Sequence, residues 1–323
     1  MDSSRRSTDR AGPSPESLRP AFQTTEIEVK EDGRLVYYGH PRTDASQLEE
    51  EVWPLFREHG YEVRLDTVRD EETDPITGVE IGETRHALIA EPRRTGIDGI
   101  PWTNVVMFLA TVLTTLYAGT IWYYQPVEGP LDLLAGWPFA VGVLGVLAVH
   151  ELGHYVFSRY HGVDASLPYF IPVPNFIGTF GAVISMRGRI PDRKALFDIG
   201  VSGPLAGLIA AVVVAIVGLH LDPVQVPEAV LESEGSIRID LGYPPLLNFL
   251  AWITGEQLTY EDPGVVANPV IFGAWVGLFV TFLNLIPVGQ LDGGHVLRSM
   301  LGKRAETIAS LVPGVLFGLA AYL

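Results

Sequence analysis

The chain has 323 residues, of which 47% are hydrophobic, and its formal net charge is −16. It contains no cysteine, which excludes disulfides and thiolate metal sites and leaves histidine and carboxylates as the strong metal ligands. An acidic chain without basic and aromatic patches is not typical of nucleic-acid binding. Residues 1–101 hold 22 of the 38 acidic and 13 of the 22 basic residues, so a soluble head before a membrane part is predicted.

The first 21 residues are polar and rich in Ser, Pro and Arg. This composition predicts a disordered tail over residues 1–21. The segment lacks the apolar core of a signal peptide, so the amino terminus is expected to stay in the cytoplasm.

Residues 22–95 are predicted to form a small cytosolic α+β domain of ββαββ order. Apolar alternation around Glu31-Asp32-Gly33 indicates a hairpin, and Ser46 with Glu49 forms a capping box that opens a helix. The expected elements are strands at 25–30 and 35–38, a helix ending at Gly60, and strands at 61–68 and 85–91. The histidines here form no catalytic cluster, so a regulatory or substrate-selecting role is expected.

Residues 100–323 are predicted to form a mainly α-helical, multi-pass membrane domain. Apolar runs predict about five spans, at residues 102–123, 137–157, 196–219, 269–287 and 308–323. The loops at 124–136 and 220–267 hold one base and ten acids between them, whereas residues 159–194 hold five bases. Because basic loops stay inside, residues 159–194 are expected on the cytoplasmic side, with the amino terminus.

The second predicted span contains His150-Glu151-Leu152-Gly153-His154. On a helix, H-E-x-x-H places two imidazoles one turn apart on one face, which suits a zinc ion, and the glutamate can act as general base. A buried pair of structural histidines is the alternative. Ionisable side chains at membrane depth are costly without a partner, and this cost favours zinc.

Residues 167–186 are apolar, but three prolines and two glycines exclude a spanning helix. A re-entrant loop or β-hairpin beside the zinc motif is expected instead. Residues 178–189 alternate like a strand whose free edge could hold an extended substrate. The candidate substrate-binding residues there are Gly178, Thr179, Phe180 and Gly181. An interfacial loop with no role in substrate binding is the alternative.

A third metal ligand, Asp292, is expected just after the fourth predicted span, in the stretch NLIPVGQLDGG. Two histidines and a carboxylate, with water in the fourth position, form a hydrolytic zinc set. Asn284 is interpreted either as an oxyanion donor or substrate clamp, or as a helix–helix hydrogen bond. Asp198 either orients a ligand histidine or complements a helix dipole. No role is expected for His161, and His295 is favoured as a neighbour of the ligands or a helix-surface residue.

In combination, H-E-x-x-H in one span and N-x-x-P-x-x-x-L-D-G in a later one resemble the site-2 protease family of intramembrane metalloproteases. The resemblance covers most of residues 100–300. The stretch GTFGAVISMRGRIPDRKALFDIGVSGPLAG is most similar to the branch of the ethylene-dependent gravitropism-deficient and yellow-green proteins. The resemblance implies one Zn²⁺ per chain, held by His150, His154 and Asp292, with Glu151 as catalytic base. It also implies an endopeptidase in the lipid bilayer that cuts membrane proteins within or near their transmembrane segments.

One position departs from the family pattern. Many members have Asn at the end of G-P-x-x-N, where this chain has Gly207. An asparagine that would steady the substrate is therefore missing, and Asn284 is the candidate to supply an amide instead, with the helix–helix hydrogen bond as its equal alternative. A zinc transporter and a catalytically inactive scaffold are the rival functions. Ligands that converge on one site, with a base beside them, favour the protease.

The acid excess also suggests adaptation to high salt, as in a halophile. With an amino terminus expected in the cytoplasm, the sequence predicts the cell membrane of a prokaryote. No oligomeric state is predicted.

Overall fold

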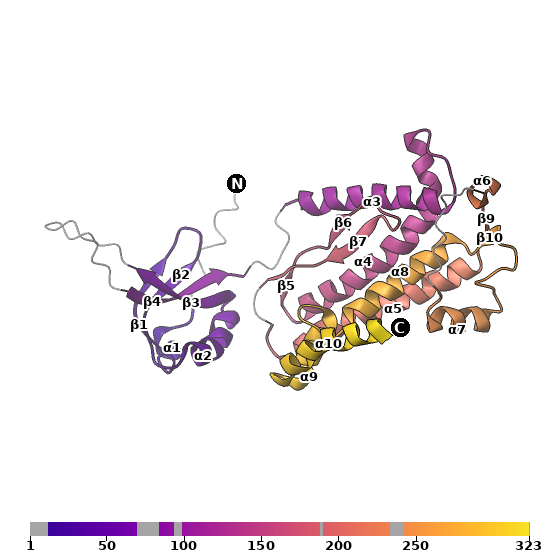
Figure 1. Ribbon diagram of the computed structural model, residues 1–323. Coiled ribbons are helices and arrows are strands. Elements are labelled where there is room, and N and C mark those ends of the chain that lie inside the picture. Colours follow the sequence, from indigo (N-terminus) through magenta and orange to yellow (C-terminus); the bar gives the residue numbers. More distant parts are fainter. Residues whose placement is uncertain (1–11, 70–83, 94–98, 188–189, 233–241, 323) are drawn as a thin grey trace, which may run out of the picture. The chain divides into compact units, whose positions relative to one another are not determined.

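The computed structural model describes residues 12–69, 84–93, 99–187, 190–232 and 242–322 (Figure 1). The chain divides into two compact units, Met1–Gly96 and Ile97–Leu323. Each unit is built around its own core, and each is described here by itself.

The N-terminal unit is a four-stranded antiparallel sheet in the order β1-β2-β4-β3. Its main elements are β1 (Phe22–Val29), β2 (Leu35–Pro41), α2 (Ala45–Glu58), β3 (Tyr61–Arg69) and β4 (Thr84–Pro92). The predicted hairpin forms between β1 and β2, and Gly33 takes the positive φ of 81° that its turn requires. The predicted capping box is wrong, because Asp44 has the extended backbone of an N-cap and α2 begins at Ala45.

The core of this unit is made of large apolar side chains between the sheet and its helices. The rings of Tyr37 and Phe56 meet edge to face, with centroids 5.2 Å apart. The core reaches into the segment that was predicted to be a disordered tail: α1 (Pro15–Leu18) buries Leu18 completely. The prediction is therefore wrong for residues 12–21, because tertiary burial of a few apolar residues outweighs their polar composition. Residues 1–11 lie outside the described part of the chain.

Within the described part of the second unit, four helices are long and apolar enough to cross a membrane. They are α3 (Trp102–Trp122), α4 (Trp137–Tyr160) with η1 (Pro130–Gly136) before it, α5 (Arg193–Leu219) and α10 (Arg304–Tyr322). The expected fourth span is α8 (Pro269–Asn284), whose 16 residues make about 24 Å of helix against a hydrocarbon core of about 30 Å. Its predicted extension to residue 287 is wrong, because the chain leaves the helix before Pro287.

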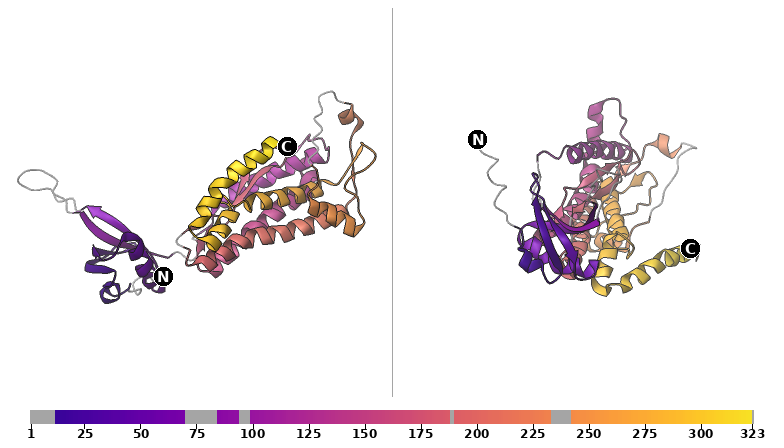
Figure 2. Two further views of the ribbon diagram at one scale, coloured as in Figure 1. Left: turned by 60° about the horizontal axis from the view of Figure 1, so that its bottom comes forward. Right: turned by 90° about the vertical axis from the view of Figure 1, so that its left-hand side faces the viewer.

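The helices α4, α5 and α8 pack against one another and form the centre of this unit. Glycines permit the close approach: a Cβ on Gly153 of α4 would lie 2.6 Å from the Ser202 carbonyl oxygen of α5. In the same way, a Cβ on Gly277 of α8 would lie 2.5 Å from Val146 Cγ1 of α4. By contrast, α10 projects away from the other long helices after α9 (Asp292–Leu301) (Figure 2).

The segment between α4 and α5 contains the predicted hairpin. β6 (Tyr169–Pro172) pairs antiparallel with β7 (Thr179–Val183), and β5 (Asp164–Ala165) pairs with β8 (Met186–Arg187). β6 packs along α3, and β7 contacts both α3 and α4. The hairpin therefore lies against the helix that carries the H-E-x-x-H motif.

Short helices and strands connect α5 to α8. They are β9 (Val224–Gln225), α6 (Glu228–Leu231), α7 (Pro245–Thr254) and β10 (Val265–Val266). Residues 233–241 of this connection lie outside the described part of the chain. α7 buries Leu247 and Leu250 in a cluster with α5 and α8, while Phe249, Trp252 and Ile253 are exposed.

Candidate metal centre

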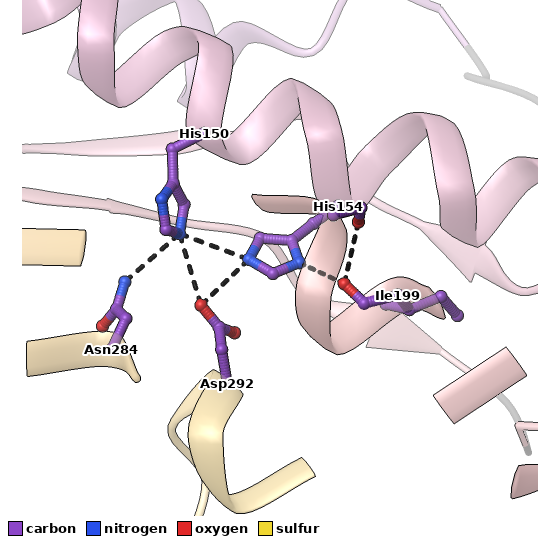
Figure 3. Close-up of polar contacts among 6 residues, drawn as sticks. His150, His154, Ile199, Asn284 and Asp292 are labelled. Atoms are coloured by element: carbon purple, nitrogen blue, oxygen red, sulfur yellow. Dashed lines mark hydrogen bonds and ion pairs between the residues drawn. The ribbon is translucent and has the colours of Figure 1, made fainter. Parts of the chain in front are cut away.

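The candidate centre begins with α4, because its apolar sequence forms one continuous helix through the motif. His150, Glu151 and His154 are all buried, with 2%, 5% and 5% of their surfaces exposed. The two histidines are one turn apart, so both imidazoles point to the same side of the helix (Figure 3).

Asp292 reaches the same place because the chain turns back sharply after α8. Gly289 has a positive φ of 53°, and α9 begins at Asp292 itself. A Cβ on Gly293 would lie 2.2 Å from the Leu285 carbonyl oxygen, so only glycine permits this tight return. The Asp292 side chain consequently points from the start of α9 toward the two histidines of α4 (Figure 3).

Three ligand atoms converge at distances that suit a metal ion. Asp292 Oδ2 lies 3.3 Å from His150 Nε2 and 3.1 Å from His154 Nε2, and the two Nε2 atoms are 3.3 Å apart. Atoms bound to a tetrahedral zinc ion at about 2.0–2.2 Å lie about 3.3–3.6 Å from one another. Two nitrogens and a carboxylate oxygen are also the donors that zinc prefers, so these residues fit the ion.

The orientation of His154 is fixed from its other side. His154 Nδ1 donates to the Ile199 carbonyl oxygen of α5 over 2.8 Å, and Ser202 Oγ donates to the same oxygen. This bond places the proton on Nδ1 and leaves the Nε2 lone pair directed at the other ligand atoms. For His150, Nδ1 has no hydrogen-bond partner among the described residues.

Two glycines of α5 make room for the imidazoles. A Cβ on Gly203 would lie 2.0 Å from His154 Nε2, and one on Gly207 would lie 2.8 Å from His150 Nδ1. Sequence reasoning read Gly207 only as a missing asparagine and gave Gly203 no role. The signal was present in the spacing, since glycines four residues apart lie on one face of a helix, as the two histidines do.

The buried carboxylate of Glu151 links the centre to the hairpin. The backbone amide of Ile184, the residue after β7, lies beside this carboxylate. The strand predicted to hold substrate therefore ends beside the predicted general base.

The other candidate residues lie at different distances from the centre. Asn284 Nδ2 is 3.2 Å from His150 Nε2, so its amide belongs to the group (Figure 3). On the hairpin, Phe180 is 73% exposed, whereas Thr179 is buried and its hydroxyl bonds within the hairpin. Gly178 lies at the turn against α3, and Gly181 has a positive φ of 105°.

Asp198 does not orient a ligand histidine. Its Oδ2 lies 2.9 Å from Nε2 of His161, which was expected to have no role, and the Ile199 carbonyl orients His154 instead. His295 is half-buried on α9 and lies outside the group of three ligand atoms. Burial lowers the pKa of His295, which keeps its ring neutral near pH 7.

Comparison with known proteins places these features in a family. The profile of Peptidase family M50 matches residues 138–319, which include every residue of the candidate centre. The probable zinc metalloprotease EGY1, chloroplastic, of Arabidopsis thaliana is 36% identical over 234 residues, which are 67% of this chain and 41% of that protein. The probable zinc metalloprotease EGY2, chloroplastic, of the same plant is 28% identical over 310 residues, 93% of this chain and 53% of that protein.

A further relative, the probable zinc metallopeptidase EGY3, chloroplastic, of Arabidopsis thaliana, is 26% identical over 68% of this chain and 40% of its own length. The chain thus spans about half, or less, of the curated relatives it matches. These relatives are chloroplast proteins of plants. The predicted location in a prokaryotic cell membrane is therefore wrong: it relied on surface charge, which reports how a protein stays hydrated and not where it resides.

Since the family profile covers more than half of the chain, together with the ligand-bearing helix and the return to Asp292, the chain belongs to Peptidase family M50, the site-2 protease family, and carries its zinc metalloprotease domain.

Proposed function

We propose that this chain is an intramembrane zinc metalloprotease that hydrolyses peptide bonds within or near the transmembrane segments of membrane proteins. The observation that carries the proposal is that Asp292 converges with His150 and His154, which lie with Glu151 in a helix long enough to cross a membrane. Ionisable groups in such a helix are costly unless they bind one another or a metal, so their grouping indicates function.

In the proposed site, His150, His154 and Asp292 hold one Zn²⁺ per chain. When bound, a zinc ion would polarise a carbonyl group and lower the pKa of its water to about 7. Glu151 takes a proton from the attacking water and delivers it to the leaving nitrogen of the peptide. Burial of Glu151 keeps bulk water away from this transfer.

The hairpin is proposed to hold the substrate in an extended form. A helical segment hides its peptide carbonyls in its own hydrogen bonds, so it must unwind before it is cut. Among the described residues β7 pairs with β6 alone, which leaves its other edge without a strand partner. Gly178, Thr179, Phe180 and Gly181 shape this edge, and the exposed ring of Phe180 is the side chain placed to contact a substrate.

Asn284 is proposed to donate a hydrogen bond to the substrate at the reacting carbonyl. It ends α8, and its amide nitrogen lies 3.2 Å from His150 Nε2, so the same amide is within reach of a group bound beside the histidine. An amide donor at this position stabilises the negative charge that develops on the carbonyl oxygen.

We further propose that the chain crosses the bilayer five times. The four long helices make four of the crossings, and α8 makes the other despite its 16 residues. A short helix is accommodated when neighbouring helices cover its ends or the bilayer thins locally. α4 and α5 pack along α8 and provide such cover. The proposed partners are a membrane-spanning protein substrate and the lipids of the bilayer.

The decisive experiment compares the purified chain with its Glu151→Gln variant in proteoliposomes. The wild type is expected to bind about one zinc per chain and to cut a synthetic transmembrane peptide. Glu151→Gln keeps the zinc and loses about 10²–10⁴-fold in rate, because only the proton transfer is removed. His150→Ala combined with Asp292→Ala is expected to lose the zinc as well. A Glu151→Gln variant that cuts at the wild-type rate rejects Glu151 as the base, and zinc transport without cleavage by the wild type rejects the protease.

A further inference from the structure

The helix α3 precedes the residues that match the family profile, and its buried face has the composition of a contact surface between membrane helices. Its buried residues are polar or small: Asn104, Thr111, Thr115, Ala118, Gly119 and Thr120. Its large apolar side chains point outward, among them Leu109 and Leu113, each 56% exposed. The small and polar side chains of this face let the backbone of the hairpin approach α3 closely.

Three side chains of α3 donate hydrogen bonds to the main chain of the hairpin segment, each at a different level of the helix. Asn104 Nδ2 donates to the Leu167 and Pro168 carbonyl oxygens over 2.8 and 3.0 Å. Thr114 Oγ1 donates to the Gly178 carbonyl oxygen over 2.6 Å. Trp122 Nε1 donates to the Phe176 carbonyl oxygen over 2.6 Å. The acceptors are backbone carbonyls of an irregular segment, which at membrane depth must find donors within the protein.

The turn of the hairpin also fits closely against the backbone of α3. A Cβ on Gly178 would lie 2.4 Å from Thr115 Cα, and Gly178 has a positive φ of 87°. The Asn175 side chain accepts hydrogen bonds from the amides of Ile177 and Gly178 and completes the turn. The turn is thus held in one place by its own Asx hydrogen bonds and by α3.

From this anchor, β7 leads directly to the catalytic helix. Gly178 precedes the strand, and Ile184, which follows it, lies beside Glu151. Six residues of extended chain span about 20 Å, so the anchor on α3 and the contact with the base lie at opposite ends of one strand. A shift of the turn along α3 would move the whole edge of β7 relative to Glu151.

We propose that α3 is a positioning element for peptide cleavage and that Thr114 is its principal positioning residue. By holding Gly178, Thr114 sets the place of the β7 edge, and with it the substrate residue that is presented beside Glu151. This inference rests on the proposed function, and it adds a determinant of substrate binding that lies outside the metal centre and outside the family match.

The test uses the whole chain in proteoliposomes and three variants of α3. Thr114→Val removes the donor with little change of volume, and Thr114→Ser restores a hydroxyl. Thr111→Val is the matched control, because Thr111 is buried on the same helix and its hydroxyl donates to the Met107 carbonyl oxygen within that helix. The probe is a lysine-flanked synthetic transmembrane peptide whose centre carries Asn-Pro-Gly to weaken its helix.

Thr114→Val is expected to raise KM about fivefold, the effect of losing one hydrogen bond, while kcat stays within about twofold. The cleavage products are expected to include a second cut site, since the strand is no longer fixed in one place. Thr114→Ser restores a low KM and a single cut site, and Thr111→Val keeps both. Equal effects of Thr114→Val and Thr111→Val, or no effect of Thr114→Val, overturn the proposal.

Amide hydrogen exchange provides a readout that needs no activity. Thr114→Val is expected to speed exchange in residues 179–184 about fivefold, and Thr111→Val to leave it unchanged. If the wild type cuts no probe, the proposed function fails, yet this comparison still decides whether α3 holds the strand. Unchanged exchange in Thr114→Val overturns the positioning role.

Discussion

In the N-terminal unit, large apolar side chains such as Phe22, Tyr37 and Phe56 fill the space between sheet and helix. In the membrane unit, α4 and α5 meet through Gly153, Gly203 and backbone atoms instead. The difference follows from the solvent. Water drives large apolar groups inward, whereas lipid gives no such force and favours close backbone approach and polar contacts. Consequently, the N-terminal core is sensitive to the loss of atoms and the membrane core to their addition.

The largest effect is expected from a single added methyl group, in Gly203→Ala. The new Cβ would lie 2.0 Å from His154 Nε2, so the imidazole must move away from the other two ligands. Zinc content is expected to fall well below one per chain. Cleavage of the transmembrane peptide is expected to fall about 100-fold or more, as for a misplacement of about 1 Å. Zinc by mass spectrometry and initial rates are the measurements.

Gly145→Ala is the control for this variant, since it lies on α4 and a Cβ there meets no atom within 4 Å. It is expected to keep zinc and activity. Full zinc occupancy in Gly203→Ala would show that α5 leaves more room at the centre than its backbone position indicates.

In the N-terminal unit, the removal of atoms from a core side chain is expected to cause a loss of stability. Phe56 is fully buried, and Phe56→Ala should destabilise this unit by about 3–5 kcal/mol through lost burial and the cavity left behind. Hydrogen exchange of the β4 amides in the full chain would measure the change. Zinc content should stay the same, because the ligands belong to the other unit. A loss of zinc in Phe56→Ala would contradict the independence of the two cores.

A smaller effect is expected from pH, through Tyr37. Burial raises the pKa of Tyr37 to about 12, and its hydroxyl donates to the Pro13 carbonyl oxygen over 3.0 Å. The unfolded chain ionises this group near pH 10, so its contribution is complete below pH 10 and is lost as the pH rises toward 12. The free energy of unfolding of this unit should fall by about 2–3 kcal/mol over that range.

Tyr37→Phe removes the ionisable group and is expected to flatten this pH dependence, which urea unfolding of the N-terminal unit in the full chain would detect. An equally steep loss of stability in Tyr37→Phe would assign the alkaline transition to other groups.

The sequence predicted the chemistry of the centre better than the contacts that support it. The ligand set was predicted because H-E-x-x-H and the later N-x-x-P-x-x-x-L-D-G are local patterns with one chemical use. The spans followed from hydropathy, but α8 proved shorter than its apolar run because the chain must leave the helix to bring Asp292 back. The spacing of Gly203 and Gly207 places them on one face of a helix, but a single sequence does not record that this face meets the histidines or that α3 bonds to the hairpin.

The Ile199 carbonyl has a consequence for how this protein tolerates variation. It is a main-chain group, so every residue type at position 199 supplies it, and no side-chain substitution there deletes the acceptor of the His154 proton. A mutational scan would report how the side chain at position 199 packs and would not detect the hydrogen bond of its main-chain carbonyl. Its importance is detectable only by replacing the peptide group itself, for example with an ester between residues 199 and 200, which weakens the carbonyl as an acceptor.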